Sequence, residues 1–243
     1  GVDIDVAREL FAAARAVGDT SALSGALADS AAAPAARAKV VADVFGAALR
    51  PVSVSLLTAA VSERWSSASD MVDGLEELAI RAAAVAEPAA PVEDELFRFT
   101  RTVAENPELE LALGSRLGDA SAKGALVDTL LTGRSSEAAR LIVSSLVQQP
   151  RERRVRQLVA NAMRVVADQR GRTVATVSSA APLSDAQVQR LSATLSKRYG
   201  TEVAINTVVD PAVIGGVRVQ IANDVIDASV STRLAELRQR LAG

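Results

Sequence analysis

The chain has 243 residues and a formal net charge of −2 at pH 7, and 49% of its residues are hydrophobic while 2% are aromatic. A chain so close to neutrality argues against a protein built to coat nucleic acid, which would carry a large basic excess. The sequence contains no Cys and no His, which excludes disulfides and thiolate metal sites and removes the commonest general base. The apolar residues are mainly Ala, Leu and Val, and because Ala and Leu are strong helix formers, we expect a mainly α-helical protein.

The first two thirds of the chain align with themselves without a gap at an offset of 86 residues, the distance from Phe11 to Phe97. The alignment covers about residues 7–61 and also pairs Arg37 with Lys123. Two amphipathic helical stretches could match by chance, because their apolar residues recur every three or four positions. We favour a duplication, since the register continues across several loops without an insertion.

The first copy is predicted to contain short helices at about residues 3–17, 22–29, 34–46, 51–64 and 70–87. Pro34 and Pro51 lie where Pro is tolerated, in the first turn of a helix, and Asp70 is the expected N-cap of the last helix. The second copy is predicted to contain helices at about residues 92–105, 107–114, 120–131, 135–148 and 150–169. We therefore expect one helical bundle at residues 1–90, a second at 91–170, and a further domain at 171–243.

The last domain begins where Gly171 ends the preceding helix and the apolar spacing changes to an alternation. This pattern predicts strands near residues 173–178, 203–209 and 217–221, so the domain is a small α/β unit. Ser184 and Gln187 form a predicted capping box at the start of the helix between the first two strands. The final helix carries one apolar stripe suited to docking, formed by Val230, Leu234, Leu237 and Leu241.

Four linked segments of this domain resemble one protein family: Ser179-Ala180-Ala181-Pro182-Leu183-Ser184, Asp210-Pro211-Ala212-Val213-Ile214-Gly215-Gly216-Val217, Asp224-Val225-Ile226-Asp227-Ala228-Ser229-Val230, and Arg233-Leu234. Their order and spacing are similar to those of the C-terminal region of F-type ATP synthase delta subunits, called the oligomycin-sensitivity-conferring protein in mitochondria. The family positions are Pro182, Leu183, Ser184, Asp210, Pro211, Gly215, Gly216, Asp227 and Ser229. One departure is Ala228, where the family usually has Gly; a positive φ there would cost Ala about 1 kcal/mol.

The resemblance implies a non-catalytic stator, or peripheral stalk, subunit that links the catalytic head to a membrane-anchored b-type stalk and resists rotation. It implies no catalytic, cofactor-binding or metal-binding residue. It also implies that a helical bundle binds the N-terminal segments of the alpha subunits, that the C-terminal domain holds the b-type stalk, and that the protein lies peripherally at the cytoplasmic face of the cell membrane. From the helical faces, the expected partner contacts are Val230, Leu234, Leu237, Leu241, Arg153 and Arg154.

The usual delta subunit has one N-terminal bundle, so two copies resemble the longer members of the family. In some of these a delta region is fused behind a b-type subunit. The chain opens at Gly1 with helical spacing already present, which fits a trimmed long delta subunit or a piece of such a fusion. No stretch of about 18 apolar residues occurs, so we expect no membrane-spanning helix.

Several motifs admit other interpretations. The basic cluster Arg151–Arg156 is a nucleic-acid patch in one interpretation, a solvated helix face in another, and a contact for an acidic protein partner in a third. The pair Gly215-Gly216 lacks the spacing of a phosphate-binding loop and favours a hairpin. The acids at residues 93–95 precede an apolar helix face and favour helix capping over acid–base catalysis. An enzyme that uses only carboxylates and Arg stays open, and it would need a deep pocket with convergent polar groups.

Overall fold

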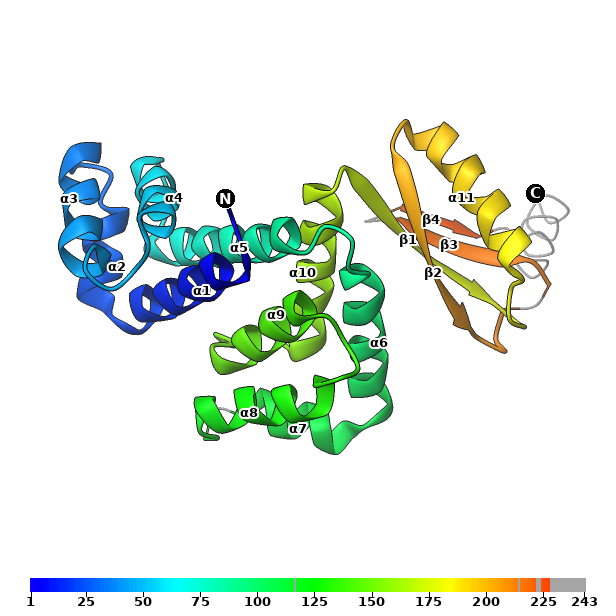
Figure 1. Cartoon of the computed structure of the whole chain (residues 1–243). Helices are drawn as coiled ribbons and strands as arrows, with labels where there is room; N and C mark the ends of the chain where they lie inside the picture. Colours follow the sequence, from blue (N-terminus) through cyan, green and yellow to red (C-terminus); the bar gives the residue numbers. More distant parts are fainter. Residues whose placement is uncertain (116, 214, 222–223, 228–243) are drawn as a thin grey trace, which may run out of the picture. The chain divides into compact units, whose positions relative to one another are not determined.

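The computed structural model describes residues 1–115, 117–213, 215–221 and 224–227 (Figure 1). It forms two compact units, residues 1–169 and residues 170–243. The first unit is helical and the second contains a small sheet, which confirms a mainly α protein with an α/β C-terminal domain. Both predicted bundles, residues 1–90 and 91–170, belong almost entirely to the first unit, and their separation into two domains stays a prediction.

The first copy forms α1 (Ile4–Asp19), α2 (Ser21–Ala28), α3 (Pro34–Phe45), α4 (Pro51–Ser62) and α5 (Ala68–Ala86). Pro34 and Pro51 occupy the first turn of α3 and of α4, as predicted, because the N–H group that Pro lacks would have no partner there. The prediction that Asp70 caps α5 is wrong. The hydroxyl of Ser67 accepts a hydrogen bond from the backbone N–H of Asp70 at 3.1 Å, so Ser67 is the N-cap and Asp70 lies in the first turn.

The second copy forms α6 (Val92–Glu105), α7 (Pro107–Gly114), α8 (Ala120–Leu131), α9 (Glu137–Gln148) and α10 (Val155–Gln169). The first and last residues of α7, α8 and α9 lie 86 positions after those of α2, α3 and α4. The packing follows the same correspondence, because α1 packs on α5 as α6 packs on α10, and α3 packs on α4 as α8 packs on α9. The offset found in the sequence therefore relates the helices as well as the residues.

One polar contact is shared by the two copies. In the first copy, the carboxylate of Glu9 accepts a hydrogen bond from the backbone N–H of Arg50, directly before α4, at 3.1 Å. In the second copy, the carboxylate of Glu95 accepts one from the backbone N–H of Ser136, directly before α9, at 2.9 Å. Each acid thus satisfies a donor that the start of a helix leaves without an intrahelical partner.

The turn before α10 differs from the prediction. A helix was expected from about residue 150, whereas α10 begins at Val155. Arg151 and Glu152 adopt φ angles of 47° and 67°, in the left-handed region that no helix of L-residues uses. The basic cluster therefore starts in a turn and enters the helix only at its end, so its members do not share one helix face.

The second unit contains β1 (Arg172–Ser179), α11 (Asp185–Tyr199), β2 (Glu202–Val209), β3 (Val217–Ile221) and β4 (Asp224–Asp227). The strand order is β2-β1-β3-β4; β1 and β2 run parallel, and the other two pairs are antiparallel. Ser184 and Gln187 form the predicted capping box of α11, and Gly200 ends the helix with a φ of 70°. Leu195 of α11 packs against strand residues in the core of this unit: Ala175, Val177, Val203, Val219 and Ile221.

Candidate protein-binding surfaces

The basic cluster is paired with acids of the first copy. The guanidinium of Arg153 donates two hydrogen bonds to the carboxylate of Glu76 on α5, at 2.8 and 2.9 Å. Arg151 hydrogen-bonds Asp73, one turn earlier on the same helix. Glu76 is only 7% exposed, so its charge needs this partner. The two arginines therefore join the turn before α10 to α5 and help to hold the two copies together.

The other two arginines of the cluster, Arg154 and Arg156, do not pair with α5. Arg156 pairs with Glu110 of α7, with its Nε 3.1 Å from the carboxylate. Arg154 is exposed, and its side chain has no hydrogen-bond or ion-pair partner within the part of the chain that the structure describes. Since three of the four arginines are neutralised by acids of the same chain, the structure gives no support to a nucleic-acid patch here.

Arg154 lines an open pocket of about 680 Å³ between α7 and the start of α10. Leu111 of α7 lines the same pocket and is 74% exposed, an unusual position for a large aliphatic side chain. Of the two predicted contacts in this region, Arg153 is used within the chain, whereas Arg154 remains free to meet a partner. We call this surface, with Leu111 and Arg154 as its members, the α7–α10 pocket.

The acids at residues 93–95 were predicted to stabilise the start of the helix that follows them, and the structure gives the three residues different places. Glu95 accepts hydrogen bonds from Ser136, the N-cap of α9, and Glu93 is buried at 5% exposure. Asp94 is exposed in the first turn of α6, where a negative charge complements the helix dipole. Asp94 therefore has the expected place at the start of α6, whereas Glu95 supports the start of α9.

In the second unit, the family positions Pro182, Leu183, Asp210 and Pro211 lie in the connections that follow β1 and β2. The backbone N–H of Asp210 donates to the carbonyl of Ser179 at 2.8 Å, and the carboxylate of Asp210 accepts from the N–H of Ala212 at 2.9 Å. The latter bond closes a turn at the end of β2, with Pro211 inside it. Leu183 is partly buried against the sheet, while its neighbour Pro182 is exposed. These residues therefore shape one edge of the domain.

Gly215 and Gly216 lead into β3 with φ angles of 62° and 101°. These angles favour glycine, which explains the pair without any phosphate ligand. Asp227 is the last residue of β4. The remaining predicted family and partner residues lie outside the described residues: Ser229, Val230, Leu234, Leu237 and Leu241.

Comparison with known proteins agrees with this reading of the sequence and the fold. The family model described as ATP synthase delta (OSCP) subunit matches residues 78–241. The ATP synthase subunit delta of Leifsonia xyli subsp. xyli is 47% identical over 242 residues, which cover 99% of this chain and 91% of that protein. The subunit delta of Streptomyces avermitilis is 40% identical over 243 residues, which cover 98% of this chain and 89% of that protein.

Among solved structures, one chain of the mitochondrial ATP synthase hexamer of Toxoplasma gondii shows a distant resemblance, with 18% identity and a TM-score of 0.40 over 70% of this chain and 98% of its own. The family match covers α6 to α10 and the whole described sheet, and the relatives extend it through the first copy. By these matches, the chain belongs to the ATP synthase delta (OSCP) subunit family.

Proposed function

We propose that this chain is a non-catalytic stator subunit in the peripheral stalk of an F-type ATP synthase, where it links the catalytic head to the b-type stalk and resists rotation. The observation that carries the proposal is the family match over residues 78–241, together with relatives named ATP synthase subunit delta that align with nearly the whole chain. The helical unit of this chain is the candidate contact for the alpha subunits. The α/β domain is the candidate contact for the b-type stalk.

The physical demands of the role match the surfaces described above. An interface that transmits torque must stay bound under load, and a dissociation constant in the nanomolar range corresponds to about 12 kcal/mol of binding free energy. Helix bundles reach such affinities by accepting an amphipathic helix along an apolar groove. The α7–α10 pocket offers an exposed aliphatic side chain, Leu111, beside an unpaired cation, Arg154. We expect it to meet an acidic amphipathic segment of a partner.

Membrane attachment in this proposal comes through the partners. Among the described residues, no helix combines the length and the apolarity that crossing a bilayer requires. The family match supports the further proposal that the chain lies peripherally at the cytoplasmic face of the cell membrane, held there by the b-type stalk or by a fused anchor.

The test is to purify the tagged full-length chain from detergent-solubilised membranes of its source and to identify the bound proteins by mass spectrometry. We expect alpha and b-type subunits in stoichiometric amounts. Membranes depleted of the chain should keep ATP hydrolysis but lose ATP-driven proton pumping, because an unanchored head turns with the rotor, and adding the chain back should restore pumping. Recovery of nucleic acid or unrelated proteins without any ATP synthase subunit would overturn the proposal.

A charge reversal tests the α7–α10 pocket separately. Arg154→Glu should weaken recovery of the partner that contacts the pocket, since it sets a carboxylate against an acidic segment. Arg134→Glu is the matched control, because Arg134 is also exposed but lies between α8 and α9. Equal recovery with both variants would show that the pocket makes no contact and would leave the stator role intact.

A further inference from the structure

Strand β2 forms one edge of the sheet, because among the described residues it pairs with β1 alone. Along a strand, the backbone N–H and C=O groups of successive residues point alternately to the two sides. The N–H of Asp210, directly after β2, donates to the carbonyl of Ser179 in β1, so the groups of the even-numbered residues of β2 face β1. The groups of the odd-numbered residues, from Val203 to Val209, therefore face away from the sheet.

The first of these outward-facing residues is already bonded by α11. The hydroxyl of Ser192 donates to the carbonyl of Val203 at 2.6 Å, and the hydroxyl of Ser196 accepts from the N–H of Val203 at 2.9 Å. Unpaired N–H and C=O groups at the edge of a sheet invite pairing with another chain, and proteins commonly cover them. Helix α11 covers the start of β2 in this way.

The cover stops at Val203. In the part of the chain that the structure describes, the outward N–H and C=O groups of Ile205, Thr207 and Val209 have no hydrogen-bond partner. Thr207 is exposed, and Val209 is 48% exposed. The segment 205–209 carries no charge, and its Ile, Thr and Val residues are favoured in strands. This segment, with its open backbone groups, is called the β2 edge from here on, and it is a template for one further strand.

We propose that the β2 edge pairs antiparallel with the β2 edge of a second molecule of this chain, about a two-fold axis at Thr207. The axis places Thr207 opposite the same residue of the partner molecule, and Ile205 opposite the partner's Val209. In such a pair, residues whose groups face the other strand exchange both N–H···O bonds, so the open groups of both edges are satisfied together. Opposed Thr residues also form a favourable cross-strand pair, and a two-fold contact needs a self-complementary surface of this kind.

The two ends of the β2 edge fit the same axis. In this register Val203 would lie opposite Pro211 of the partner molecule; the groups of Val203 are taken by α11, and Pro211 has no N–H to donate. The turn that Asp210 closes with Ala212 ends the strand directly after Val209, so the partner strand stops before it would meet α11. An antiparallel register shifted by two residues would instead set open groups against Val203 or Pro211, which cannot pair with them.

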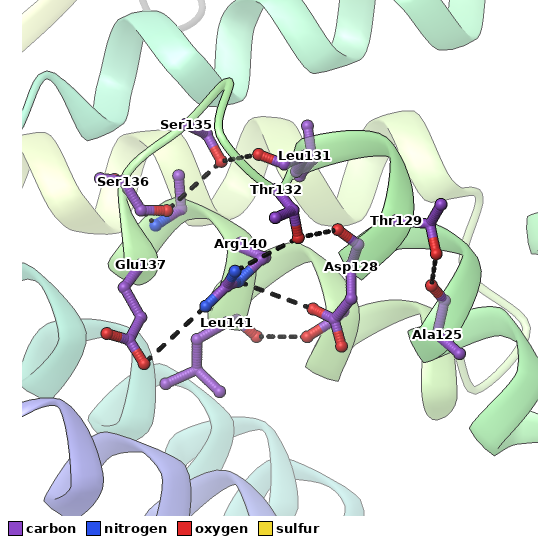
Figure 2. A network of polar contacts seen from close by, with 12 residues as sticks. Ala125, Asp128, Thr129, Leu131, Thr132, Ser135, Ser136, Glu137, Arg140 and Leu141 are labelled. Carbon is purple, nitrogen blue, oxygen red and sulfur yellow. Dashed lines mark hydrogen bonds and ion pairs between the residues drawn. The ribbon is translucent and has the colours of Figure 1, made fainter.

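Surface polar groups of the helical unit give a contrast, because in several places they are paired with one another. Arg140 lies between Asp128 and Glu137 (Figure 2), and Glu137 also accepts a hydrogen bond from Arg8 at 2.7 Å. A second molecule would have to break such contacts before it could use these groups, whereas the groups of the β2 edge are open to pairing.

The first test is the oligomeric state of the isolated full chain, and its outcome does not depend on the proposed stator role. The contact is one strand pair, so association should be weak and reversible, as for the smallest protein interfaces. Sedimentation equilibrium over a range of chain concentrations should therefore show a monomer–dimer equilibrium. A monomer at every concentration up to the solubility limit would overturn the proposal.

Two substitutions at the axis locate the contact. Thr207→Pro removes the outward N–H of both molecules and is tolerated where an edge strand faces solvent, so it should raise the dissociation constant of the dimer by about tenfold or more. Thr207→Lys sets like charges directly opposite each other and should also weaken the dimer. The control is Val225→Lys, because Val225 is 59% exposed in β4 at the other edge of the sheet. All three variants should keep the circular-dichroism spectrum of the original chain. A dimer that neither change at Thr207 weakens would contradict the pairing.

The absence of Cys allows a covalent test, because one introduced thiol is then unique in the chain. Thr207→Cys places two thiols opposite each other, where paired Cα atoms lie about 5.5 Å apart, a separation that a disulfide can bridge. With dissolved oxygen as the oxidant, the covalent dimer should form about tenfold faster, or more, than in Val225→Cys. Equal rates, or faster trapping through Val225→Cys, would show that the molecules do not meet at the β2 edge.

Discussion

The hydrogen bonds that Glu95 accepts from Ser136, the N-cap of α9, allow a quantitative test of whether the two copies unfold together. The perturbation is Glu95→Ala, which removes the acceptor of two hydrogen bonds from the N–H and the hydroxyl of Ser136, at 2.9 and 2.5 Å. Hydrogen bonds to a charged group contribute about 1.5–3 kcal/mol each, and we take ~1.5 because the carboxylate is partly open to solvent. The expected loss is ~3 kcal/mol in the free energy of unfolding. Glu95→Gln keeps one acceptor oxygen and should lose about half as much.

The assay is urea unfolding followed by two signals. Far-UV circular dichroism follows all helices, whereas fluorescence follows Trp65, the single Trp of the chain. Trp65 belongs to the first copy, where its indole N–H donates to the carbonyl of Ala60 at 2.9 Å. With a urea dependence of ~2 kcal/mol per M, a loss of ~3 kcal/mol lowers the midpoint by about 1.5 M. If the copies form one cooperative unit, Glu95→Ala should shift the Trp65 signal by the same amount.

Two results would refute this reasoning. A circular-dichroism transition that shifts while the Trp65 transition stays in place would show that the copies unfold separately, as two domains. A midpoint unchanged in both signals would show that these two hydrogen bonds contribute nothing to stability. The control is Asp94→Ala, because Asp94 is exposed in the same helical turn and its loss should cost only about 0.5 kcal/mol through the helix dipole.

Three further predictions concern acidity, ion pairing and a turn. Burial raises the pKa of Glu9, but hydrogen bonds from Ser53 and Arg50 outweigh it and hold the pKa below its ordinary value of 4.5. A carboxyl group with a lowered pKa in the folded state stabilises the fold at neutral pH, and this stabilisation is lost as the pH falls. The urea midpoint should therefore drop between about pH 6 and pH 3, and it should drop less in Glu9→Gln. Arg153→Ala leaves the buried carboxylate of Glu76 without its bidentate partner and should lower the free energy of unfolding, measured with urea, by ~2 kcal/mol. Adding Glu76→Gln to this variant should recover part of the loss, because it removes the unpaired charge. Gly216→Ala, at a φ of 101°, should cost about 1–2 kcal/mol in thermal unfolding of the α/β domain, and an unchanged melting temperature would show that the turn relaxes.

The sequence predicted the helical part of the fold well because its signals are local and occur twice. Pro34 and Pro51 mark helix starts, and the gapless offset carries the same boundaries into the second copy. In the α/β domain, the capping box at Ser184 and the glycine at Gly200 were likewise readable, since each acts on residues within one turn of itself. Capping and turn chemistry of this kind depends on a few neighbouring residues, so one sequence suffices to find it.

The contacts that define the candidate surfaces were not readable in the same way. Arg153 and Glu76 are 77 residues apart, and Glu95 and Ser136 are 41 residues apart. Nothing in the spacing of charges indicates such pairs, because they form only after α5, α9 and α10 have packed. The basic cluster was therefore interpreted as a solvated face, a nucleic-acid patch or a contact for an acidic partner. In the structure, three of its four arginines pair with acids of the same chain.

The contact between the copies also bears on how the helical unit can carry a mechanical load. The corresponding helices α5 and α10 pack on each other, and α9 packs on α1 and α5. Hydrogen bonds from Arg153 to Glu76, and from Arg81 to Asp168 and Gln169, cross the same boundary. A load applied to one copy therefore passes to the other through several contacts at once, as the proposed resistance to rotation requires.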